Sequence, residues 1–133
     1  MEVKVKVYMD DSMKFIEEAL KEFKVGVENN DTIRIRDAAE KAWNAVVQAT
    51  NALILYYLDK TPSSYWERRR LLRELERVKP EVESLSLRDR YSARERNLHE
   101  LVFYGGAIDV NDVEFELEKA KKYVEDVRKL LRV

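Results

Sequence analysis

The 133-residue chain has no cysteine and only one histidine, His99. Without cysteine it cannot form a disulfide, a thiolate nucleophile or a cysteine-ligated metal site, and one histidine is too few for a histidine-rich zinc site. A glycine-rich phosphate loop, a nucleophile elbow and the usual metal-ligand spacings are also missing. We therefore expect neither a metal nor another cofactor.

Long apolar runs are missing as well. The longest covers residues 52–58, far short of the roughly 20 residues that a membrane-spanning helix needs. The first residues also lack the apolar core of a signal peptide. We expect a cytoplasmic protein without a membrane partner.

Charged residues of both signs are abundant, and their near balance leaves a net charge of -1. That balance by itself favours neither a nucleic-acid nor a membrane partner. Abundant Glu, Lys and Arg beside a single glutamine resembles the composition of heat-adapted proteins, in which ion pairs become more favourable as temperature rises. The composition therefore predicts a thermophilic source.

Apolar residues recur at helical spacing through most of the chain. The pattern predicts a first helix over residues 12–28, a second over 32–58 and a third over 65–79. A fourth begins between 81 and 87 and ends near 104, and a last helix covers 111–131. Candidate N-caps precede these helices: Asp10, Asp11 and Ser12 for the first, Asp31 or Thr32 for the second, a residue of the loop 60–64 for the third, and Asp109 or Asn111 for the last. The glycine pair at 105–106 is expected to end the fourth helix.

Residues 1–9 follow another pattern, in which Val3, Val5 and Val7 alternate with charged residues. A period of two predicts a short extended segment. The chain is therefore expected to form one domain over residues 1–133. Its fold class is all-α, an antiparallel up-and-down bundle of four to five helices with an N-terminal extension at 1–9.

Arginine is concentrated in one part of the chain, because nine of the thirteen arginines lie between residues 68 and 96. The planar guanidinium group binds phosphate and stacks on bases, so this cluster favours nucleic-acid binding. Pairing with the interleaved acidic residues at helical spacing is the alternative. On the helix over 65–79, the apolar pattern places Trp66 inward and most arginines outward.

The stretch 87–104, LRDRYSARERNLHELVFY, surrounds His99 with Arg88, Arg90, Arg94 and Arg96. Histidine is the usual general acid or base near neutral pH. Metal-free RNA cleavage needs such a group and a cation that stabilises charge on the phosphate. His99, Arg94 and Arg96 are therefore the candidate catalytic residues, with Arg88 and Arg90 as candidate binding residues. A partly buried structural histidine is the alternative.

Five further residues are candidates for binding. Asn97 follows Arg96 directly, and Tyr104 ends the same stretch with a ring suited to base stacking. Asn44, Gln48 and Asn51 form a polar stripe on the helix over 32–58. That stripe is either a solvated face or the lining of a pocket or dimer interface.

Two segments together resemble the archaeal PaREP1 family, which is similar in turn to the HEPN superfamily of helical bundles. They are RIRDAAEKAWNAVVQATNALI at 34–54 and LHELVFYGGAIDVNDVEFELEKAKKYVEDV at 98–127. The resemblance is carried by Glu40, Lys41 and Trp43 at the start of the alanine-rich helix, by Leu98, His99, Phe103 and Tyr104, and by the acidic, capped last helix. It implies a HEPN-like bundle that forms a symmetric homodimer.

Many HEPN proteins are metal-independent ribonucleases in which an Arg, followed by a polar residue, precedes a His by four to six residues. Arg94 and His99 are separated by four residues, but Glu95 follows the arginine. Arg96 and Asn97 supply the expected doublet, yet only two residues separate Arg96 from His99. On an ideal α-helix Arg94 and His99 point about 140° apart, so a site that uses Arg94 needs a distorted helix or a second subunit.

The resemblance implies an RNA- or nucleotide-binding protein, with metal-independent endoribonuclease activity of a toxin or defence type if it is catalytic. The alternative that it implies is a catalytically inert helical module. Such a module would bind a partner protein, for example a nucleotidyltransferase.

Overall fold

The computed structural model describes residues 2–132, and most of them are helical. The elements are α1 (Glu2–Glu28), α2 (Thr32–Leu58), α3 (Tyr65–Val78), α4 (Pro80–Ser84), α5 (Leu87–Arg94), the π-helix η1 (Glu95–Tyr104) and α6 (Val110–Leu131). No strand occurs within residues 2–132. The predicted all-α bundle is confirmed, with the short α4 and the separate η1 as additions.

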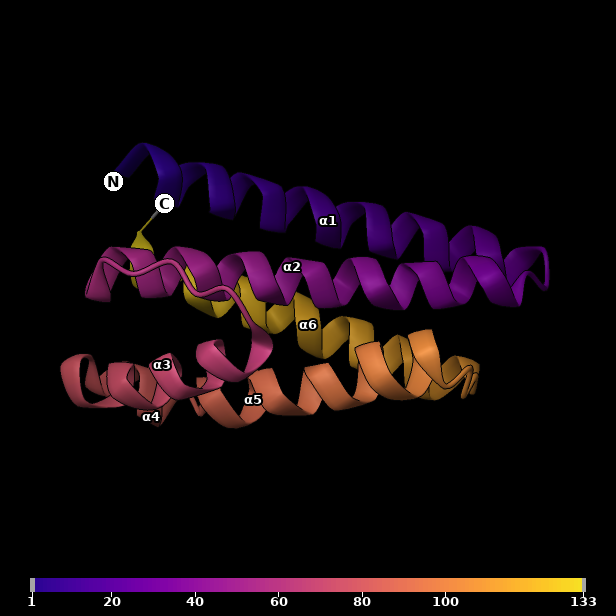
Figure 1. The fold of residues 1–133 in the computed structure, drawn as a ribbon. Coiled ribbons are helices and arrows are strands. Elements are labelled where there is room, and N and C mark those ends of the chain that lie inside the picture. The colour runs from indigo at the N-terminus through magenta and orange to yellow at the C-terminus, as the bar shows by residue number, and fades with distance from the viewer. Residues whose placement is uncertain (1, 133) are drawn as a thin grey trace.

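The helix α2 lies in the middle of the bundle (Figure 1). It packs against α1 as a long antiparallel hairpin, and against α6, η1 and α3 on its other sides. The chain runs back along α5 and η1 and returns through α6, so that α1 begins and α6 ends at the same end of the molecule (Figure 1).

The extended segment predicted for residues 1–9 is wrong for residues 2–9, which form the first two turns of α1; Met1 lies outside the described residues. Val5 and Met9 are buried, whereas Val3 and Val7 are exposed. The buried positions therefore follow a four-residue step that continues toward Ile16. Packing of this helical stripe in the core outweighs the alternating pattern of the valines.

The caps of α2, α3 and α6 are among the predicted candidates, whereas the start predicted for the first helix near Ser12 is wrong, because α1 already begins at Glu2. The side chains of Asp31, Ser64 and Asp109 each accept a hydrogen bond from the backbone N–H three residues later. These bonds satisfy donors that have no partner within the helix. Each cap acts through neighbouring residues alone, which is why the sequence could narrow these helix starts to a few candidate residues.

The end of η1 is fixed by a glycine and an arginine. Gly106 adopts a φ of 67°, which side chains other than glycine rarely tolerate. The guanidinium group of Arg36 on α2 donates two hydrogen bonds to the carbonyl of Phe103, at 2.9 and 2.6 Å. The last turn of η1 is thereby tied to α2.

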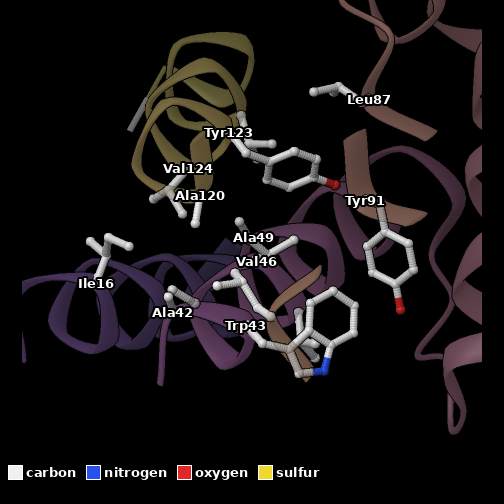
Figure 2. Packing of buried hydrophobic residues seen from close by; sticks show 14 of the residues in the cluster. Ile16, Ala42, Trp43, Val46, Ala49, Leu87, Tyr91, Ala120, Tyr123 and Val124 are labelled. Carbon is white, nitrogen blue, oxygen red and sulfur yellow. The ribbon is translucent and has the colours of Figure 1, made fainter. Parts of the chain in front are cut away.

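The core is built around small residues of α2. Its alanines are fully buried, and they let α1 approach so closely that the Ser12 hydroxyl donates to the Ala45 carbonyl at 2.6 Å. On other sides of α2, the large rings of Trp43, Tyr91 and Tyr123 are buried where α2 faces α5 and α6 (Figure 2). Trp43 lies wholly in this core.

The stretch over 87–104 differs from the single α-helix predicted for it. After Arg94 the backbone changes to a π-helix, in which N–H groups bond to carbonyls five residues back, as Gly105 does with Glu100 at 2.8 Å. π-helical turns are rare, and they often occur at functional sites. The extra residue in each turn changes which side chains of η1 share a face, so the angle expected between Arg94 and His99 on an α-helix does not apply.

Candidate functional site

His99 lies on η1 and faces α2. Its Nδ1 atom is 2.7 Å from Oε1 and 3.1 Å from Oε2 of Glu40. The side chain of His99 is only 13% exposed and that of Glu40 is 21% exposed. A carboxylate bonded to Nδ1 fixes the orientation of the imidazole ring and directs Nε2 away from the pair, as in histidines that act as a general base.

Aromatic rings surround this pair. The His99 ring packs edge-on against Tyr65 and Tyr104, at centroid distances of 5.2 and 4.9 Å, and it stacks on Phe103 at 6.3 Å. Trp43, one turn after Glu40 on α2, lies 6.0 Å from it. Five of the residues that carry the family resemblance are therefore brought together in space, Glu40, Trp43, His99, Phe103 and Tyr104, whereas Lys41 pairs with Glu22 on α1.

Arg94 points elsewhere. Its Nε atom donates to Glu116 on α6 at 2.8 Å, and Asn97 donates to the other oxygen of the same carboxylate at 3.0 Å. Arg94 is 4% exposed, and this burial lowers the pKa of its guanidinium group, while Glu116 opposes the shift. His99 is thus held toward α2 and Arg94 toward α6, and within residues 2–132 neither a hydrogen bond nor an ion pair joins the two side chains.

The remaining arginines of this stretch have different surroundings. Arg96 is exposed and has no ion-pair partner among residues 2–132. Arg88 lies 3.4 Å from Glu76. Arg90 is 2.9 Å from Asp126 and packs over the ring of Tyr123. Of the four arginines around His99 in sequence, only Arg96 presents an unpaired charge to solvent.

The polar stripe on α2 is partly internal. Asn51 is buried; its side chain accepts a hydrogen bond from Nε of Arg68 at 2.7 Å and donates to Gln48 at 3.2 Å. Gln48 also lines a hollow between α1 and α2, and Asn44 is half-buried. Asn51 therefore anchors α3 to α2. Tyr104, in contrast, is exposed beside His99.

A groove between α3 and α5, about 550 Å³ in volume, gathers arginines from both helices. We call it the arginine groove; it is lined by Trp66, Arg69, Arg70, Arg73, Arg88, Asp89 and Ser92. The prediction that Trp66 faces inward is wrong, because 64% of this residue is exposed. The guanidinium carbon of Arg70 lies 5.8 Å from the centre of the indole ring, at a cation–π distance.

The two interpretations of the arginine cluster apply to different residues of this groove. Arg69 forms an ion pair with Glu95, and Arg88 lies beside Glu76. Arg70 and Arg73 are exposed, and neither has a carboxylate partner within residues 2–132. Two positive charges therefore remain available to an anion.

The sequence contained a signal for this arrangement that the apolar pattern obscured. Trp66, Arg70 and Arg73 are spaced i, i+4 and i+7, which puts them on one face of a helix. A tryptophan that shares a helix face with two arginines can form an exposed stacking surface as readily as it can fill a core.

The fold and the groove define a small helical protein with an open cationic surface and, apart from it, an enclosed histidine–carboxylate pair. Among residues 2–132, no helix is long and apolar enough to cross a membrane, and no group of three or more His, Cys, Asp or Glu side chains is placed to hold a metal ion. The chain belongs to the archaeal PaREP1/PaREP8 family, whose model matches residues 14–124, and the family prediction is confirmed. Comparison with curated proteins and with solved structures gave no match.

Proposed function

We propose that this protein binds RNA or nucleotides through the arginine groove. The observation that supports this most directly is the exposed indole of Trp66, with Arg70 packed over it and Arg73 on the same face of α3. Guanidinium groups bind phosphate oxygens, and an exposed aromatic ring stacks on bases of any sequence.

The same geometry favours a single strand over a duplex. An indole ring can stack only on a base whose face is free, and the bases of a duplex are stacked on one another. The groove lies open on the surface and reaches from α3 to α5. We therefore expect unpaired nucleotides to bind, with their phosphates near Arg70 and Arg73.

The two tryptophans provide the test, because Trp66 is exposed and Trp43 is fully buried. Titration with a single-stranded RNA of about ten nucleotides, a length within the usual site sizes, should quench the fluorescence of Trp66. In Trp66→Ala the quenching should disappear. The affinity for labelled RNA, measured by anisotropy, should fall about 5- to 150-fold, the worth of one stacking contact.

Phe115→Ala is the matched control, since this residue is an equally exposed aromatic on α6, 66% accessible. It should bind RNA as the unaltered protein does. If Trp66→Ala retains full affinity, or both variants lose it equally, the arginine groove is not the binding site.

We further propose that His99 gives the protein a HEPN-like, metal-independent ribonuclease activity. Two features support it: Glu40 orients the imidazole ring, and Arg96 is an unpaired cation on the same π-helix. Arg94 would have to leave Glu116 before it could contact a phosphate. We also propose a homodimer, in which a second copy supplies the cation that Arg94 cannot provide while Glu116 holds it.

Incubation of labelled RNA with the purified protein and a chelator tests cleavage. His99→Ala should abolish it, and His99→Gln, whose amide can still donate to Glu40, should abolish it without loosening the fold. Both variants should keep the RNA-induced quenching of Trp66. Cleavage that persists unchanged in either variant would remove His99 from the mechanism.

A further inference from the structure

The N-terminal half of α6 has a charge opposite to that of the arginine groove. Residues 109–118 contain five carboxylates, Asp109, Asp112, Glu114, Glu116 and Glu118, and no lysine or arginine. Among them stands the exposed ring of Phe115.

A groove of about 800 Å³ lies beside this ring, between η1 and α6. We call it the acidic groove. Its apolar lining consists of Leu101, Val102, Ala107, Ile108, Val113 and Phe115. Leu101 and Phe115 are both exposed, and the two helices that carry them are held together below by the contacts of Glu116 with Arg94 and Asn97. The groove is thus preformed and open to solvent.

The polar lining of the acidic groove is negative. Asp109 and Asp112 line it at the start of α6, and neither forms an ion pair within the described part of the chain. The carboxylate of Glu116 is already neutralised by Arg94, and Lys119 is the one cation that contributes to the lining. A partner bound in the acidic groove would therefore contact its apolar lining and the unpaired carboxylates of Asp109 and Asp112.

We infer that the acidic groove binds a basic amphipathic helix of a partner protein. A helix seats an apolar ridge, spaced i, i+3, i+4 and i+7, in such a groove. Lysine or arginine on its flanks would meet Asp109 and Asp112, since complementary potentials guide association and fix its specificity. RNA does not fit this surface, because the carboxylates repel its phosphates.

A second copy of the chain fits less well than a basic partner. In a two-fold dimer with this groove on the symmetry axis, Asp109 and Asp112 of one copy would face the same carboxylates of the other. Like charges placed opposite each other across an interface are costly. The charge of the groove is therefore the reason to assign it to a partner of opposite sign. This inference is independent of RNA binding on α3 and α5.

Two designed peptides of about five helical turns test the assignment. Both carry the same leucine ridge; one has lysine on its flanks and the other has glutamate. At low salt the basic peptide should bind at least about tenfold more tightly than the acidic one, by fluorescence anisotropy with the full-length protein. Equal binding of the two peptides would overturn the proposal.

Phe115→Ala should weaken binding of the basic peptide about tenfold or more, because the ring would lose its burial against the ridge. Val3→Ala shortens an exposed apolar side chain on a different helix, α1, and should leave the affinity for the basic peptide unchanged. Wild-type affinity in Phe115→Ala would overturn the assignment. So would a dimer, seen by light scattering, that Phe115→Ala dissociates, because the groove would then belong to a second copy.

Discussion

Two groups of arginines in this protein have opposite surroundings. Those that face α6 are paired: Arg94 is buried against Glu116, and Arg90 lies beside Asp126. Those on the outer face of α3, Arg70 and Arg73, have no carboxylate partner in residues 2–132. Acidic residues are interleaved with both groups in the sequence, so local composition does not separate them.

The difference lies in the neighbouring helix. The acidic α6 packs along α5 and η1 and supplies carboxylates to the arginines that face it. Within residues 2–132 no helix covers the outer face of α3, where Trp66 is also exposed. A buried arginine depends on its carboxylate partner, because removing that partner leaves a buried charge uncompensated, whereas an arginine left in solvent remains available for a ligand. The two groups should therefore respond differently to mutation.

The largest effect is expected in the buried group. Glu116→Ala removes the carboxylate that both Arg94 and Asn97 contact and leaves a buried guanidinium charge without a partner. Breaking a buried pair in this way costs about 3–5 kcal/mol of unfolding free energy. Urea denaturation followed by circular dichroism measures it.

Two comparisons sharpen that result. Lys6→Ala breaks the exposed pair with Asp10 and should cost no more than about 1 kcal/mol. Replacing both buried partners, as Arg94→Met with Glu116→Leu, should recover most of the stability, because no unpaired charge remains. If Glu116→Ala is as mild as Lys6→Ala, Arg94 is not a buried structural charge.

The solvent-facing group should affect RNA binding and not stability. Arg70→Ala combined with Arg73→Ala should weaken RNA binding about tenfold at low salt. The slope of log affinity against log salt should decrease by about 1.4, since each phosphate neutralised on a single strand contributes about 0.7. Anisotropy titrations at several salt concentrations measure both quantities.

The control removes the same charge from another surface. Lys4→Ala with Lys21→Ala alters two exposed lysines of α1 that have no partner within residues 2–132. It should leave the slope nearly unchanged. A similar decrease in both double variants would indicate attraction by the whole molecule rather than binding in the arginine groove.

The parts of the fold that depend on neighbouring residues could be predicted from the sequence. Asp31, Ser64 and Asp109 cap their helices through bonds to the backbone three residues later, and the caps are visible in the sequence. The valines near the N-terminus mislead because their alternation is also local, whereas burial of Val5 and Met9 depends on packing in the core.

The partners of the site residues could not be predicted, because they lie far away in the chain. His99 meets Glu40 across 59 positions, and Arg94 meets Glu116 across 22. The change from α-helix to π-helix after Arg94 also depends on how this segment packs, and no residue type in the stretch signals it. The sequence identified His99 as a candidate site residue, but it did not show that Glu40 would be the charged residue facing it.

The smallest predicted effect concerns a residue at the boundary between the two groups. Arg69 lines the arginine groove but forms an ion pair with Glu95, the first residue of η1. Glu95→Gln removes a negative charge beside the groove and releases Arg69 to contact phosphate. RNA affinity should rise about two- to fivefold, as expected for a half-exposed pair. Glu118→Gln removes the same charge from α6 and should leave the RNA affinity unchanged. Equal gains in both variants would mean that only net charge matters, and that the pairing of individual arginines does not decide where RNA binds.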